Sequence, residues 1–192
     1  MKEWVRVLVV DDCALLFEGV RQALAHSENF KIIGEANDGA TALAWMERER
    51  PDIVLLDCRL PDLSGWEVAA LAQARGYPSR LIGYSAHEEY DDVMGMLQNG
   101  AVGYVTKDES AENLFQAIET VARGGTWFSQ RISKKLVEWA LMPAVELTVQ
   151  ETNVLRLLAR GKTDAEIMAG LGIAPRTLRH HLRNIMDKLH LE

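Results

Sequence analysis

The stretch Val7-Leu8-Val9-Val10-Asp11-Asp12 decides the fold, because four apolar residues run directly into two acids. A second apolar run, Ile53-Val54-Leu55-Leu56, ends in the same way at Asp57. Two later apolar runs end in Ser85 and in Lys107. Neighbouring strands of a parallel sheet end side by side, and open α/β sheets place their ligand sites along that edge. The pattern therefore predicts that three carboxylates, one hydroxyl and one ammonium converge, which suits a divalent cation and a phosphoryl group.

Strand-like and helix-like segments alternate over residues 1–124, as is typical of a doubly wound parallel α/β sheet. Five strands are expected, near residues 5–10, 31–36, 53–57, 80–84 and 102–105. Five helices are expected between and after them, near residues 14–25, 39–49, 64–75, 88–99 and 110–123. Short connections with right-handed crossovers then give a five-stranded, flavodoxin-like topology.

From Leu147 onward the pattern is helical only, with two short helices joined by a glycine-containing turn. The second of these helices is basic, and such a pair is typical of a helix-turn-helix. Residues 125–146 form a linker with an expected helix from about 129 to 141, stopped by Pro143. The sequence thus predicts a first domain over residues 1–124 and a small all-α domain over residues 147–192.

The charge of the chain is divided unevenly, which bears on its partners. Residues 1–144 hold 14 basic and 22 acidic residues, a net charge of −8, whereas the rest holds 7 basic and 6 acidic residues, a net charge of +1. The overall charge of −7 therefore does not argue against nucleic-acid binding by the C-terminal part. No run approaches the ~20 apolar residues of a membrane span and the start lacks a secretory signal, so a cytoplasmic protein without membrane contact is expected.

The two cysteines, Cys13 and Cys58, each follow a candidate site aspartate. A redox or metal role is one interpretation, and small buried packing residues are the other. The second is favoured, because neither cysteine belongs to a cluster with the spacing of metal ligands.

The motifs of the first segment resemble the receiver domain of bacterial two-component response regulators, over roughly residues 5–123. The resemblance rests on Asp11-Asp12, Asp57 with Leu60-Pro61-Asp62 and Gly65, Ser85-Ala86, and Gly103-Tyr104-Val105-Thr106-Lys107. The last segment resembles the LuxR-type DNA-binding domain, through Leu147-Thr148, Val154-Leu155, Gly161, Glu166-Ile167, Leu171-Gly172-Ile173, Thr177-Leu178, His181, Asn184-Ile185 and Lys188-Leu189. A receiver joined to such a domain is the arrangement of NarL/FixJ-type response regulators.

The receiver resemblance implies a role for each residue of the strand-end site. Asp57 is expected to accept the phosphoryl group, Lys107 to neutralise its oxygens, and Ser85 to donate a hydrogen bond to it. Tyr104 is expected to turn inward as Ser85 moves, although simple packing at the edge of the core would also explain it. A Mg²⁺ ion is expected on Asp11, Asp12, Asp57 and the main-chain carbonyl of Arg59.

Two further residues flank that site, Arg59 two positions after Asp57 and His87 two positions after Ser85. The resemblance implies that they tune the lifetime of the phosphoryl group, and the alternative is that they are exposed polar loop residues. The expected chemistry is acceptance of the phosphoryl group on Asp57, with autodephosphorylation, and no other enzymatic activity.

The basic helix is expected to enter the major groove of double-stranded DNA. Arg179, His180 and Arg183 share one outward face and are expected to read base edges, and a solvated basic face is the alternative. Three residues are better placed for phosphates, namely Arg176, Thr177 and Lys188. The opposite, apolar face carries Leu178, Leu182, Ile185 and Leu189.

Two departures from the LuxR-type pattern stand out. Asn153 takes the place of the usual glutamate, so an ion pair within the domain is expected to be missing. The chain stops at His190-Leu191-Glu192, where family members continue into a further helix, so dimers and DNA affinity are expected to be weak if this end is native.

The leading hypothesis is a response regulator whose phosphorylation on Asp57 by a sensor histidine kinase controls sequence-specific DNA binding, with homodimers forming in the phosphorylated state. An alternative is a phosphorylation-independent DNA-binding regulator whose receiver serves protein contacts. A haloacid-type phosphatase also uses a strand-end aspartate and Mg²⁺. It usually has a second acid where Arg59 stands, and it leaves the helix-turn-helix without a role.

Overall fold

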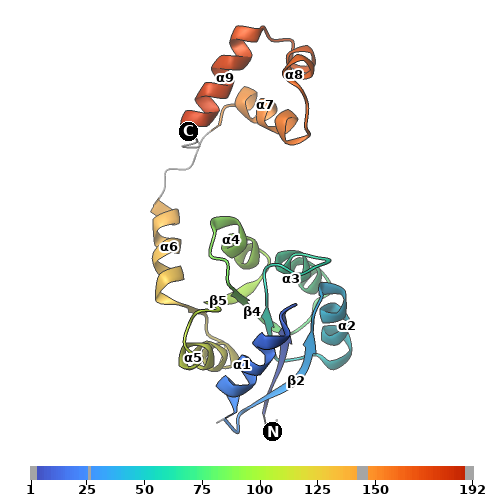
Figure 1. Cartoon of the computed structure of the whole chain (residues 1–192), viewed down its shortest axis with the longest axis vertical. Coiled ribbons are helices and arrows are strands. Elements are labelled where there is room, and N and C mark those ends of the chain that lie inside the picture. The colour runs from blue at the N-terminus through green and yellow to red at the C-terminus, as the bar shows by residue number, and fades with distance from the viewer. Residues whose placement is uncertain (1–3, 26, 142–146, 189–192) are drawn as a thin grey trace. The chain divides into compact units, whose positions relative to one another are not determined.

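The computed structural model describes residues 4–25, 27–141 and 147–188, and the chain divides into two compact units, Met1–Ala140 and Leu141–Glu192 (Figure 1). Within these described residues, every helix is too short or too polar to cross a membrane.

The first unit is built on one parallel sheet. Its strands are β1 (Val5–Val10), β2 (Phe30–Ala36), β3 (Ile53–Leu56), β4 (Arg80–Ser85), β5 (Ala101–Thr106) and β6 (Trp127–Phe128), in the spatial order β2-β1-β3-β4-β5-β6. The connecting helices are α1 (Ala14–Leu24), α2 (Gly39–Glu49), α3 (Gly65–Ala74), α4 (Tyr90–Gln98) and α5 (Ala111–Ala122). The predicted doubly wound parallel sheet with a following helical domain is therefore confirmed.

Side-chain alternation along the central strands produces two apolar layers. Leu8 and Val10 pack into the core beneath α2, α3 and α4, whereas Val7 and Val9 pack against α1 and α5. Figure 1 shows α2 and α3 on one side of the sheet and α1 and α5 on the other. Because both faces are covered, the strands are continuously apolar and the polar residues are left to the strand ends.

The prediction of five strands is wrong by one, because β6 adds a sixth at the edge of the sheet. After Gly124, whose φ of 91° is in the left-handed region, the chain returns beside β5 and pairs Trp127 with Gly103. A Cβ atom on Gly103 would lie 2.9 Å from the Trp127 carbonyl oxygen, so glycine permits this approach. A strand of two residues is too short to show the alternation from which strands are predicted.

The described residues of the second unit form the helices α7 (Val149–Ala159), α8 (Asp164–Leu171) and α9 (Pro175–Lys188). Thr148 and Thr163 each begin a helix with a capping box, which satisfies free amides at the start of α7 and α8. Gly172 ends α8 in the left-handed conformation (φ 64°), as expected of the turn of a helix-turn-helix.

The small core of this unit contains Val154, Ile167, Leu178 and Ile185. The predicted contact of Leu189, the stop at Pro143, and the expectation about the chain end at 190–192 all concern segments outside the described residues.

Candidate functional site

Three carboxylates meet at the C-terminal edge of the sheet. Asp11 and Asp12 follow β1, Asp57 follows β3, and one oxygen from each lies within 4.8 Å of the others. Asp11 and Asp57 are buried, whereas Asp12 is exposed. Parallel pairing of β1 with β3 brings the two strand ends together, since Val10 lies opposite Leu56.

Lys107, which follows β5, brings its ammonium group to these acids. Its Nζ lies 2.6 Å from Asp11 Oδ2 and 2.7 Å from Asp57 Oδ2. Burial opposes the charge of the ammonium group, but hydrogen bonds and charge from the two aspartates outweigh burial and raise the pKa of Lys107. Burial also raises the pKa of Asp11, in spite of the nearby ammonium. The lysine therefore remains a fixed positive charge facing the Asp57 carboxylate.

The second oxygen of Asp57 is held by two donors. The Ser85 hydroxyl donates to Asp57 Oδ1 at 2.6 Å, and the Cys58 amide donates to the same oxygen at 2.7 Å. Gly65 packs closely against the main chain of Asp57. A Cβ atom at this position would lie 2.1 Å from the Asp57 carbonyl oxygen, so only glycine fits there. The predicted aspartates, Ser85 and Lys107 are thus brought into one site, in which Asp57 is oriented from several sides.

Tyr104 lies inward and fully buried. Its hydroxyl donates to the His87 carbonyl at 2.6 Å and lies 3.1 Å from Cys58 Sγ, and its ring occupies the space above Gly83, where a Cβ atom would be 2.6 Å away. Burial raises the pKa of the Cys58 thiol to about 11. That thiol is a protonated packing group, as the favoured interpretation predicted for Cys58, whereas Cys13 is exposed and is not a buried packing residue.

Arg59 and His87 lie at the rim of this site, and their side chains contact acids of α4 and of the segment before it. Arg59 Nη2 is 3.0 Å from Asp92 Oδ2 and 4.0 Å from Glu89 Oε2, and His87 Nδ1 is 3.7 Å from Glu89 Oε2. Asp92 was not predicted from the sequence, because it resembles any other acid at the start of a helix.

Helix α6 (Gln130–Leu141) packs on the first unit next to the same loops. Arg131 lies 2.8 Å from Glu88 through Nε and 2.5 Å from Asp108 through Nη2, so one guanidinium bridges the loops after β4 and β5. Lys135 donates to the Glu88 carbonyl at 3.0 Å, and Trp139 stacks edge-on against Tyr90, with ring centroids 5.2 Å apart. These contacts were not predicted from the sequence.

The acids fit a hard divalent cation. Asp11, Asp12 and Asp57 supply the oxygen ligands that Mg²⁺ prefers. The buried Asp11 Oδ2 is paired with the Lys107 ammonium group and has no other hydrogen-bond donor among the described residues. The main chain of Arg59 is paired with that of Ser64, which fixes the loop that carries its carbonyl.

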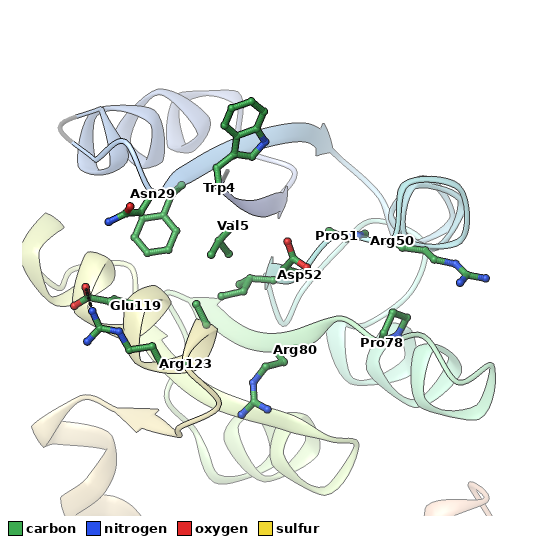
Figure 2. Close-up of a pocket in the computed structure, with 13 residues that line it drawn as sticks. Trp4, Val5, Asn29, Arg50, Pro51, Asp52, Pro78, Arg80, Glu119 and Arg123 are labelled. Atoms are coloured by element: carbon green, nitrogen blue, oxygen red, sulfur yellow. Dashed lines mark hydrogen bonds and ion pairs between the residues drawn. The ribbon is translucent and has the colours of Figure 1, made fainter. Parts of the chain in front are cut away.

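A cavity of about 740 Å³ lies at the opposite edge of the sheet, where Val5, Ile53 and Arg80 begin their strands (Figure 2). Two of its arginines contact other parts of the protein: Arg123 pairs with Glu119 at 2.7 Å, and Arg80 donates to the Gly125 carbonyl at 2.8 Å. It contains none of the strand-end acids, so the polar edge described above remains the candidate site.

In the second unit, the outward face of α9 is basic. Its exposed residues include Arg176, Thr177, Arg179, His180 and Arg183, the residues expected to contact DNA. His180 Nε2 lies 3.3 Å from Asn184 Nδ2, whereas His181 is half-buried. Leu178 and Ile185 face the opposite way, into the core, so the helix carries one basic and one apolar face.

Lys188, which was expected to contact a DNA phosphate, forms an ion pair within the second unit that was not predicted. Its Nζ lies 2.7 Å from Glu151 Oε2, and the Glu151 side chain is only 2% exposed. This pair joins α7 to α9 and supplies an ion pair of the kind that Asn153 was expected to leave missing. Asn153 instead accepts a hydrogen bond from Arg156 at 3.2 Å.

The Glu151–Lys188 pair predicts how this unit responds to acid. The Lys188 hydrogen bond, helped by the Thr148 amide, lowers the pKa of Glu151 from 4.5 to about 2. A lowered pKa contributes stability that is present above pH 4.5 and is lost as the pH falls towards 2. We expect the unfolding temperature of this unit to fall as the pH falls from 4.5 to 2. In Glu151→Gln, which retains the capping hydrogen bond, the unfolding temperature should depend less on pH over the same window.

Methyl NMR of the buried Ile167 reports this unit alone and measures that transition. Glu166→Gln removes a carboxylate from an exposed pair with Lys162 and serves as the matched control. An equal reduction of the pH dependence in both variants would contradict a special role for Glu151.

Comparison with known proteins extends over both units. Residues 7–119 match the family described as "Response regulator receiver domain", and residues 145–192 match "Bacterial regulatory proteins, luxR family". A protein of Mycobacterium tuberculosis described as "Probable transcriptional regulatory protein NarL" is 35% identical, over 97% of this chain and 88% of its own length.

Among solved structures, the receiver domain of the putative response regulator NarL from Mycobacterium tuberculosis is 41% identical with a TM-score of 0.61, over 64% of this chain and 98% of its own. A structure described as a complex of the response regulator RcsB with DNA has a TM-score of 0.77 at 20% identity, over 98% of this chain and 93% of its own, which shows a shared fold.

Proposed function

The chain belongs to the two-component response regulators that join a receiver domain to a LuxR-type DNA-binding domain, and from this we propose that phosphorylation of Asp57 controls its binding to DNA. The observation that carries the proposal is the Asp57 carboxylate, with Ser85 Oγ 2.6 Å from one oxygen and Lys107 Nζ 2.7 Å from the other. The exposed basic face of α9 is the surface that is proposed to bind DNA.

In the proposed reaction, an Asp57 oxygen forms a bond to the phosphorus of a sensor kinase's phosphohistidine. The P–N bond breaks, and its electron pair stays on the imidazole, which takes up a proton from solvent. Lys107 and Ser85 contact the phosphoryl oxygens of the acyl phosphate. Asp11, Asp12, Asp57 and the Arg59 carbonyl would hold a Mg²⁺ ion, whose charge offsets the repulsion between carboxylate and phosphoryl group. Hydrolysis of the acyl phosphate by water then resets the protein.

The proposed signal leaves the site through the loop after β4. When Ser85 turns to a phosphoryl oxygen, it moves the main chain at His87, to which the Tyr104 hydroxyl is bonded. Glu88, the next residue, is held by Arg131 and Lys135 of α6. Movement of this loop therefore changes how α6 is held, and α6 precedes the DNA-binding unit in the chain.

We assign the remaining roles as follows. Residues 1–124 form the receiver, 125–146 the linker and 147–192 the DNA-binding domain, and the protein acts in the cytoplasm. Arg179, His180 and Arg183 contact bases, and Arg176 and Thr177 contact phosphates of double-stranded DNA. The phosphorylated form is a homodimer. Arg59 and His87 tune the phosphoryl lifetime.

The test uses the whole chain with Mg²⁺ and acetyl phosphate as the phosphodonor. Intact mass measures phosphoryl gain, and fluorescence anisotropy measures affinity for duplex DNA selected in vitro by the protein. We expect phosphorylation and an increase in affinity of about tenfold or more, which is the scale of typical allosteric couplings. Equal affinity of both forms would instead support the phosphorylation-independent regulator.

A further inference from the structure

Four charged or titratable residues form a cluster at the rim of the phosphorylation site, here called the rim cluster: Arg59, His87, Glu89 and Asp92. One ligand atom from each of His87, Glu89 and Asp92 lies within 4.8 Å of the others. Arg59 supplies the cation of this cluster, since its guanidinium is 3.0 Å from Asp92 and 4.0 Å from Glu89.

Asp92 is the buried partner of the Arg59–Asp92 ion pair. Its side chain is 5% exposed, whereas that of Arg59 is 56% exposed. Removing the guanidinium would leave a buried carboxylate without its ion-pair partner, which is costly. The Asp92 carboxylate therefore retains Arg59 at 3.0 Å.

Arg59 stands two residues after Asp57, so two anions compete for one guanidinium once Asp57 is phosphorylated. A guanidinium binds two phosphoryl oxygens in a fork and would cover the phosphorus from water. While Arg59 is paired with Asp92, the phosphoryl group lacks this cover. The strength of the Arg59–Asp92 pair thus sets how often water reaches the phosphorus.

We propose that Asp92 is a positioning residue that shortens the phosphoryl lifetime by holding Arg59 away from Asp57. This inference rests on the proposed function, and it adds to the rim a residue that does not itself touch the phosphoryl group. Glu89, more exposed and farther from the guanidinium, acts in the same direction and more weakly.

The expected effects follow from which anion retains Arg59. Asp92→Asn frees the guanidinium and lengthens the half-life of the phosphorylated chain about fivefold, the scale of one partly exposed ion pair. Arg59→Ala removes the cover and shortens the half-life about twofold by the same reasoning. The double variant behaves as Arg59→Ala alone, because Asp92 acts only through Arg59. A role of Asp92 in folding alone would not depend on Arg59 in this way.

The experiment phosphorylates the whole chain with acetyl phosphate and Mg²⁺, removes the donor on a desalting column, and follows loss of the phosphoryl group by intact mass. Asp91→Asn is the matched control, because it makes the same change at the neighbouring, exposed position of α4. Glu89→Gln, at an exposed position, carries the test if Asp92→Asn does not fold, and it is expected to lengthen the half-life about twofold.

Equal half-lives in wild type, Asp92→Asn and Glu89→Gln would overturn this inference and leave the proposed function standing. So would a longer half-life that persists in the Arg59→Ala background. A folded wild-type chain that gains no phosphoryl group overturns the proposed function and this inference together. The first mass measurement, made on the wild-type chain, therefore distinguishes the two failures.

Discussion

Asp57→Asn should abolish phosphoryl gain completely while leaving the fold intact. The amide keeps the size of the carboxylate and an oxygen that can accept from Ser85 and the Cys58 amide, so the packing around the side chain is retained. It lacks the anionic oxygen that attacks phosphorus, and it loses the charge that faces Lys107. Incubation with acetyl phosphate and Mg²⁺ should therefore add mass to the wild type and none to the variant.

Asp91→Asn provides the control for that result, since it removes a carboxylate from an exposed position of the same unit. We expect it to gain the phosphoryl group at the wild-type rate. Gain by Asp57→Asn equal to that of wild type would place the acceptor elsewhere. Peptide mapping of the phosphorylated wild type would then locate it.

Replacing Arg179 and Arg183 together with alanine should remove most of the specific DNA affinity. Both side chains are exposed on the basic face of α9, and neither contributes to the apolar cluster that includes Leu178 and Ile185. An arginine that reads a base edge contributes ~1–3 kcal/mol, so each substitution should weaken binding about 10- to 100-fold. Fluorescence anisotropy against the selected duplex measures this loss.

Two comparisons show whether the loss reports base reading or charge alone. Arg160→Ala removes an exposed arginine at the end of α7 and should change affinity little. Arg176→Ala should weaken binding to all sequences alike and reduce the slope of log affinity against log salt by about one. A double variant that retained wild-type discrimination between sequences would remove Arg179 and Arg183 from the reading face.

Lys188 illustrates where sequence reasoning about DNA contacts reached its limit. Its place near the end of the basic helix predicts a phosphate contact, and its ion pair at 2.7 Å with Glu151 on another helix was not predicted. Helical spacing places a residue on a face, and it does not reveal which neighbouring helix supplies a buried partner. The same spacing placed Arg179 and Arg183 on the exposed side of the helix, in agreement with the structure.

The strand-end site was more accessible to sequence reasoning. Apolar runs that end in Asp11, Asp57, Ser85 and Lys107 fix the site once the sheet is known to be parallel, because strand order and register then place the ends together. Asp92 and Arg131 contribute through the packing of α4 and α6 against loops, and no local pattern marks such contacts. The sixth strand was missed for a related reason, since it is formed only by pairing with β5.

The contacts of α6 within the first unit also determine where this chain can be joined to a domain of another protein in a chimera. A chimera joined after residue 124 would discard Arg131, Lys135 and Trp139, and with them the bridge between the loops after β4 and β5. A chimera joined after Ala140, where the first compact unit ends, would carry that bridge along intact. A chimera that joins the first unit to a foreign DNA-binding domain should therefore be joined after Ala140. It then retains α6, the helix through which the receiver is proposed to transmit its signal.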